Sequence, residues 1–247
     1  MFLNEYLKMK EIESHINNII CETFKSLYAV YPKAGGESRA ANIKSRIIFP
    51  PYSGSKEEQD RGELRVSEQE LRFTFVEKFA EYCDKKGLDY LYSVETPTNK
   101  KYFFSDGDTV RTLRAKGEEI EIPCMHNNGS SANIDLVIHG SNGERLCLIE
   151  FKANNPAPDE IGKDLVKLTN KEEYDEVAKK PIPRYFIGMV KSSQPKETRE
   201  NILEKIYNIK LKTKDELNSE TVHIIFHNIH NNEVLFTDDF KFAKAKQ

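Results

Sequence analysis

The 247-residue chain lacks the short motifs by which many enzymes hold a nucleotide or activate a serine. It has no GxxxxGKS/T loop for ATP or GTP phosphates, no GxGxxG turn for a dinucleotide and no GxSxG elbow. It also has no internal repeat. Without a loop to hold ATP, the chain is not an ATP-driven motor.

Cysteine and long apolar runs are also scarce. The four cysteines, Cys21, Cys83, Cys124 and Cys147, form no CxxC pair. We interpret them as free, buried thiols rather than as disulfides or a zinc site. No stretch approaches the ~20 apolar residues of a membrane span, and the N-terminus lacks the continuous apolar core of a signal peptide. We therefore expect a cytoplasmic protein without a membrane partner.

Acidic and basic residues are nearly balanced, with a formal net charge of −3 and an isoelectric point near 6.1. No global field therefore draws the protein toward nucleic acid, and any such contact requires a local basic patch. Arg39, Lys44 and Arg46 are candidates for contacts with a phosphate backbone. A solvated surface explains these three residues equally well.

Two apolar segments, residues 133–138 and 147–152, flank an Asn142-Gly143 dipeptide. Asn-Gly strongly favours a two-residue type I′ turn, whose central residues both need positive φ. The hairpin closed by this turn places Asp135 directly opposite Glu150. Opposed side chains have Cβ atoms about 5 Å apart, and two carboxylates at that distance repel by roughly 3 kcal/mol at an effective dielectric near 20. A divalent cation between them would offset the repulsion.

The second strand of this hairpin is apolar until its end. Leu146, Leu148, Glu150 and Lys152 share one face because side chains alternate with a period of two, and unpaired charge is costly on a buried strand. Hard carboxylate oxygens suit Mg²⁺ or Mn²⁺, and a neighbouring lysine can orient water or stabilise developing negative charge. Asp135, Glu150 and Lys152 together predict metal-assisted hydrolysis of a phosphodiester. The other interpretation is an ordinary hairpin whose exposed charges bind no metal.

This arrangement, an aspartate on one strand and Glu150-Phe151-Lys152 on the next, resembles the PD-(D/E)XK nuclease superfamily of restriction-endonuclease-like proteins. Ile134 stands where the family's name has proline. The resemblance implies that Asp135, Glu150 and the backbone carbonyl of Phe151 hold Mg²⁺ or Mn²⁺. It also implies that Lys152 acts in catalysis.

Ser67-Glu68-Gln69-Glu70 has the form of a capping box, with serine at the N-cap and glutamate at position N3. It predicts a helix that runs to about Lys86 and ends at Gly87. In the resembled superfamily, a helix before the first core strand often adds an acidic ligand to the metal site. Glu70 is the best match for this catalytic role and Glu77 the second. Because a capping box explains Glu70 fully, ligand and cap remain open alternatives.

The remaining patterns predict an α/β (α+β) fold, a mixed β-sheet flanked by helices, which the resemblance makes restriction-endonuclease-like. We expect helices over residues 4–31, 159–171 and 195–211, and further strands over 89–95, 101–104, 185–190, 221–229 and 233–236. We divide the chain into an N-terminal helix with a basic connecting segment (1–62) and a nuclease-like core (63–247) with an insertion at about 97–132.

Two other pairs of residues invite a functional interpretation. Asp164 and Lys167 lie three apart on the helix after the hairpin, where we expect a surface ion pair, with support of a catalytic group as the alternative. His223 and His227 fall on one face of a strand without a third ligand nearby. We interpret this histidine pair as structural.

These features favour a metal-dependent nuclease that hydrolyses phosphodiester bonds, with DNA as the favoured substrate. The resemblance alone suggests restriction, phage (antiviral) defence or DNA processing. A net charge of −3 suggests that a second copy of the chain or a protein partner supplies grip on the substrate. Two alternatives stay open: a catalytically silent binding or scaffold subunit with this fold, and an RNA-directed nuclease effector.

Overall fold

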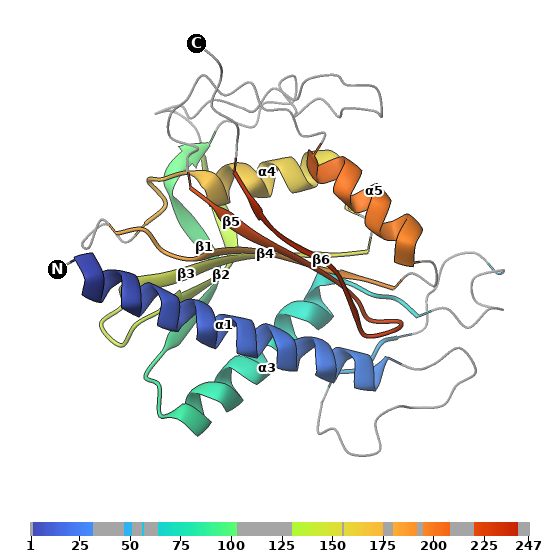
Figure 1. Ribbon diagram of the computed structural model, residues 1–247, viewed down its shortest axis with the longest axis horizontal. Coiled ribbons are helices and arrows are strands. Elements are labelled where there is room, and N and C mark those ends of the chain that lie inside the picture. Colours follow the sequence, from blue (N-terminus) through green and yellow to red (C-terminus); the bar gives the residue numbers. More distant parts are fainter. Residues whose placement is uncertain are drawn as a thin grey trace, which may run out of the picture.

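A computed structural model describes residues 2–31, 47–50, 56, 64–102, 130–154, 156–174, 180–191, 195–207 and 220–241. Within them the protein is an α+β structure, with a mixed six-stranded sheet between two helical layers (Figure 1). The helices are α1 (Phe2–Val30), α3 (Glu68–Lys86), α4 (Pro158–Thr169) and α5 (Pro195–Tyr207). The strands are β1 (Leu91–Tyr102), β2 (Ser130–His139), β3 (Arg145–Ala153), β4 (Arg184–Val190), β5 (Val222–Asn228) and β6 (Glu233–Phe240).

The sheet keeps the order of the sequence, from β1 at one edge to β6 at the other. Pairs β1–β2, β2–β3 and β5–β6 are antiparallel, whereas β3, β4 and β5 run parallel. The parallel connections pass through α4 and α5, as parallel strands require a crossover. Figure 1 shows α4 and α5 on one face of the sheet and α1 and α3 on the other. The predicted mixed sheet with flanking helices is confirmed.

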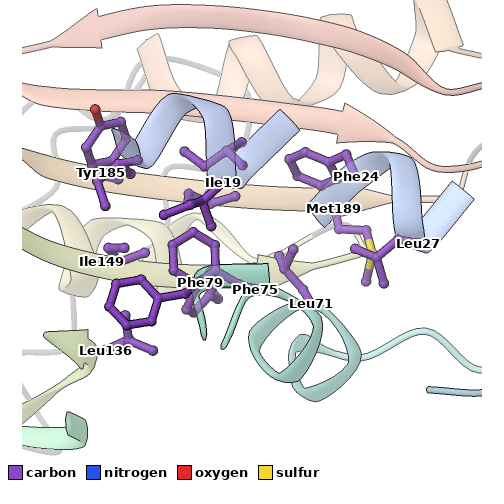
Figure 2. Packing of buried hydrophobic residues seen from close by; sticks show 14 of the residues in the cluster. Ile19, Phe24, Leu27, Leu71, Phe75, Phe79, Leu136, Ile149, Tyr185 and Met189 are labelled. Carbon is purple, nitrogen blue, oxygen red and sulfur yellow. The ribbon is translucent and has the colours of Figure 1, made fainter. Parts of the chain in front are cut away.

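The α1 and α3 helices pack on the sheet through one apolar core (Figure 2). The predicted apolar stripe of α1, including Ile16, Ile19 and Leu27, is buried in that core. The rings of Phe75 on α3 and Phe151 on β3 meet edge to face at 5.5 Å. The first turn of α3 lies close to the end of the strand that carries Glu-x-Lys, where Glu68 Oε1 is 3.5 Å from Lys152 Nζ.

The α3 helix has the ends that the sequence predicts. Ser67 is its N-cap and its N–H donates to the Glu70 carboxylate, and Gly87 ends the helix in the left-handed conformation, with a φ of 63°. Only glycine adopts that conformation without a Cβ penalty.

The hairpin turn differs from the prediction. Gly143 has a φ of 83°, but Asn142 does not have the positive φ that a type I′ turn needs. The Gly143 N–H donates to the Gly140 carbonyl at 2.9 Å, and the Gly140 N–H to the Glu144 carbonyl at 2.9 Å. This is a three-residue loop, a turn followed by a left-handed glycine. An irregularity between Ile138 and His139 then shifts the register, so Asp135 and Glu150 still end up opposed.

The β1 strand also differs from the prediction. Two strands were expected on either side of Pro97, but one strand runs through it, with an irregular register between Pro97 and Lys101. Proline is tolerated there because β1 is an edge strand, where one backbone face forms no ladder. The predicted insertion at 97–132 therefore begins and ends inside paired strands, and residues 103–129 lie outside the described residues.

Several smaller predictions have a definite outcome. Cys83 and Cys147 are buried, but Cys21 is exposed, contrary to expectation. Four residues singled out in the sequence lie outside the described residues, namely Arg39, Lys44, Arg46 and Cys124. The domain boundary expected near residue 62 also lies outside them. None of the helices in the described part of the chain is long and apolar enough to cross a membrane.

Gly188 of β4 lies between the Lys152 position of β3 and Phe226 of β5. A Cβ at Gly188 would lie 2.1 Å from a carbon of the Phe226 ring, and that ring is fully buried. We expect Gly188→Ala to lower the free energy of unfolding by about 1–3 kcal/mol, because an overpacked core must shift. Urea denaturation measures the change. Since the cause is the ring, Gly188→Ala combined with Phe226→Leu should recover part of the loss, and no recovery would contradict this explanation.

Candidate functional site

Three carboxylates stand in one row across neighbouring strands. Leu136 of β2 pairs with Ile149 of β3, and this register carries Asp135 opposite Glu150. On the other side, β1 and β2 keep the same register before and after Glu95, which places Glu95 opposite Asp135. Like charges in such positions repel one another, so the row needs cations.

Glu150 is the most buried member of the row, with 1% of its surface exposed. Burial, together with the nearby Asp164 carboxylate, raises the pKa of Glu150 well above its usual range. Its partner is Lys167 of α4, whose Nζ lies 2.5 Å from Glu150 Oε1 and 2.8 Å from Asp164 Oδ1. Lys167 also donates a hydrogen bond to the Asn133 carbonyl at 2.8 Å. The buried carboxylates are thus neutralised by a lysine from the crossover helix.

Lys152 lies at the same end of β3. Its Nζ is 2.7 Å from Asp164 Oδ2, 3.5 Å from Glu68 Oε1 and 3.2 Å from the Phe151 carbonyl oxygen, to which it donates. Burial alone would lower the pKa of Lys152, but Asp164 and Glu68 outweigh it and raise the pKa above its usual value. Lys152 is therefore a fixed cation at neutral pH, suited to stabilising negative charge rather than to accepting a proton.

Asp135 is half-buried and connects the two strands of the hairpin. Its Oδ2 accepts a hydrogen bond from the Phe151 N–H at 2.8 Å. Its Oδ1 lies 3.8 Å from Nη1 of Arg72, on α3. The structure therefore brings together Asp135, Glu150, Lys152 and the Phe151 backbone, as predicted from the sequence.

Glu70 is not part of this group. Its Oε2 accepts hydrogen bonds from the N–H of Ser67, at 2.7 Å, and from the Ser67 hydroxyl, so it serves the helix cap. Glu77 lies nine residues after Glu68 on α3, about 13 Å further along the helix axis. The acidic residue of α3 that reaches the site is Glu68, beside Lys152. Burial raises the pKa of Glu68, against the attraction of Lys152.

The positions of Asp164 and Lys167 differ from the prediction. Both are buried and contact the site, so the expected surface ion pair is wrong. A sequence signal for this was present, because both fall among the buried apolar residues Ile161, Leu165 and Leu168 of the same amphipathic helix. A charged residue inside an apolar stripe requires a charged partner on the element it packs against.

The histidine pair has no part in the site. His227 stacks on Phe24 of α1, with ring centroids 4.3 Å apart, and burial lowers its pKa to about 4. His223 Nδ1 lies 2.5 Å from Asp239 Oδ1 on β6. These contacts agree with the structural interpretation of both residues.

The donor set fits a hard divalent cation in its chemistry. Asp135, Glu150 and the Phe151 carbonyl offer oxygen ligands from adjacent strands, and Glu68 of α3 lies beside Lys152 at the edge of the site. Among the described residues, no three Asp, Glu, His or Cys side chains converge on one point. The ammonium groups of Lys152 and Lys167 stand among the carboxylates instead. A bound cation would thus replace lysine contacts with metal contacts.

No protein-family model matches the chain, and neither curated proteins nor solved structures show significant similarity to it.

The roles of Glu68 and Glu70 can be separated by matched substitutions. We expect Glu70→Ala to lower the free energy of unfolding by about 1 kcal/mol, through loss of the cap, and to leave Mg²⁺ affinity unchanged. Glu68→Ala should instead weaken Mg²⁺ binding by about 10–100-fold, as loss of a supporting group does. Calorimetric titration and urea denaturation of both variants measure these effects. Weaker Mg²⁺ binding in Glu70→Ala alone would contradict the assignment.

Proposed function

We propose that the protein is a metal-dependent nuclease of the PD-(D/E)XK type, which hydrolyses phosphodiester bonds in nucleic acid, with DNA favoured. The observation that carries the proposal is the junction of β2 and β3, where Asp135 accepts a hydrogen bond from the backbone of the Glu-x-Lys segment. A mixed sheet with helices on both faces supports a restriction-endonuclease-like fold. The resemblance to that superfamily suggests a role in restriction, phage defence or DNA processing, in the cytoplasm.

The residues of the site divide into those that would hold the cation and a lysine that acts on the phosphate. Asp135, Glu150 and the Phe151 carbonyl would hold Mg²⁺ or Mn²⁺, with Glu68 at the edge of the site. When bound, such an ion polarises the phosphate and lowers the pKa of a coordinated water. Lys152, fixed by Asp164 at 2.7 Å, stabilises the negative charge that develops on the phosphate oxygens.

A second candidate is a catalytically silent binding or scaffold subunit. One observation favours it: the ammonium group of Lys167 forms ion pairs with both Glu150 and Asp164. An RNA-directed nuclease effector shares the catalytic chemistry and differs only in substrate. The net charge of −3 also supports a second copy or a protein partner that supplies positive surface.

Cleavage of plasmid, single-stranded DNA and RNA in Mg²⁺, Mn²⁺ or EDTA tests the proposal. We expect cleavage with either metal and none in EDTA, and the substrate that is cut names the class. If no substrate is cut and no metal binds, the scaffold subunit is the better explanation. If metal binds but nothing is cut, a missing partner is indicated, and gel filtration shows whether the chain is alone.

A further inference from the structure

Arg72 of α3 lies at the rim of the site, beside Asp135, and has no part in the mechanism described above. Only 13% of its side chain is exposed. Its Nη1 lies 2.5 Å from Glu95 Oε1 and 3.8 Å from Asp135 Oδ1, and its Nη2 donates to Gln69 Oε1 at 2.8 Å. The guanidinium group is therefore held in one place by β1 and by its own helix.

Glu95 has an unusual backbone. Its φ is 48°, a left-handed value that residues with a side chain seldom adopt, and it occurs in the middle of an edge strand. Strained conformations of this kind gather at functional sites. Glu95 stands opposite Asp135 in the register, and both carboxylates lie near Nη1 of Arg72, at 2.5 Å for Glu95 and 3.8 Å for Asp135. Of the two carboxylates, Glu95 is the closer partner of Arg72.

Arg72 lies beside a residue that would hold the cation, because its Nη1 is 3.8 Å from Asp135 Oδ1. A phosphate drawn to a cation on Asp135 would therefore lie beside this guanidinium group. A planar guanidinium group with five N–H donors matches the geometry of a phosphate and can bind it through two hydrogen bonds.

We propose that Arg72 binds a phosphate of the nucleic acid, either the reacting phosphate or the one next to it in the backbone. Glu95 is the residue that positions Arg72. The proposal rests on the proposed function, since it takes nucleic acid as the ligand. Arg72 thus adds a binding contact from α3 to the catalytic groups of β2 and β3. The contact is local, which agrees with a chain whose net charge provides no general attraction for nucleic acid.

The test is the salt dependence of binding to a fluorescent duplex oligonucleotide, with Ca²⁺ in place of Mg²⁺ and a gel to verify that the duplex stays intact. We expect Arg72→Gln to bind about tenfold more weakly and to lower the slope of log K against log salt by about 0.9, the value for one lost phosphate contact. Arg199→Gln, an exposed arginine on α5, is the control and should leave the slope unchanged. An unchanged slope in a folded Arg72→Gln variant would overturn the proposal.

Arg72→Lys decides the matter if Arg72→Gln does not fold. The lysine keeps the positive charge, so the slope of log K against log salt should not change. It lacks the planar guanidinium group, so the affinity for the duplex should fall several-fold. An Arg72→Lys variant with wild-type affinity would overturn the proposal. Glu95→Gln should weaken binding in the wild-type background and not in an Arg72→Gln background, whereas a merely structural Glu95 would act equally in both. A wild-type protein that neither binds nor cuts nucleic acid would refute the proposed function itself. If wild type cuts nucleic acid and substitutions of Arg72 leave its binding unchanged, only this inference is refuted.

Discussion

Replacing Asp135 by asparagine is expected to lower the rate of Mg²⁺-dependent cleavage by about 10³-fold or more, with the fold intact. The substitution keeps the shape of the side chain and an oxygen that can accept the Phe151 N–H, now 2.8 Å from Oδ2. It removes the charge that a hard cation needs. Losing one group that acts only on the transition state costs 10²–10³-fold by itself, and losing a metal ligand removes the activated water as well.

The control for this variant is Asp84→Asn, an exposed aspartate on α3. It makes the same chemical change far from the site and should leave the rate unchanged. Thermal melting of both variants verifies that they are folded. An Asp135→Asn protein that cuts at the wild-type rate would remove Asp135 from the mechanism.

Replacing Lys167 by methionine is expected to lower the free energy of unfolding by about 3–5 kcal/mol. Lys167 is the cation within 2.8 Å of both Glu150 and Asp164, and both carboxylates are buried. Breaking a buried ion pair by removing one partner leaves an uncompensated buried charge, which is the costly case. Urea denaturation at neutral pH measures the loss.

The loss should depend on pH in a defined direction. The pKa of Glu150 is raised in the folded protein, so the folded state binds a proton that the unfolded state has released. The free energy of unfolding contributed by this group therefore rises as the pH falls through the folded pKa. We expect the Lys167→Met variant to regain stability, relative to wild type, as the pH falls, because protonation of Glu150 removes the unpaired charge.

Two variants make the result specific. Lys163→Met, one turn earlier on α4 and only partly buried, should change the free energy of unfolding by less than about 0.5 kcal/mol. Glu150→Gln combined with Lys167→Met should recover part of the stability, because both charges are then gone. If Lys167→Met is no more destabilising than Lys163→Met, the ion pair contributes nothing.

Local patterns in the sequence predicted the elements well. The α3 helix starts and ends where Ser67 and Gly87 predict, because caps depend on neighbouring residues alone. The buried face of α1 follows from its helical period. The sequence correctly predicted that Asp135 lies opposite Glu150, although the predicted turn type was wrong. The loop has one residue more than predicted, and an irregularity in the hairpin compensates for it.

The cations of the site were not predicted, because their positions depend on packing between distant elements. Lys167 reaches Glu150 only because the crossover helix lies over β3, and Arg72 reaches Asp135 only because α3 packs on the opposite face. Glu68 was missed for the same reason: the sequence shows which acid fits a capping box, but not which one faces the strand end. Patterns in a single sequence predict the helices and strands. The partners of buried charges can be identified only once the arrangement of those elements in space is known.

The central claim is that Asp135, Glu150 and the Phe151 carbonyl form a site for a divalent cation. Calorimetric titration of wild type and Asp135→Asn with Mg²⁺ and Mn²⁺, combined with thermal melting at each metal concentration, tests it most directly. We predict saturable binding by wild type, with stabilisation of about 2.7 kcal/mol at a metal concentration of 100 times Kd, and neither effect in Asp135→Asn. No saturable binding by wild type, or equal binding by the variant, would contradict the claim.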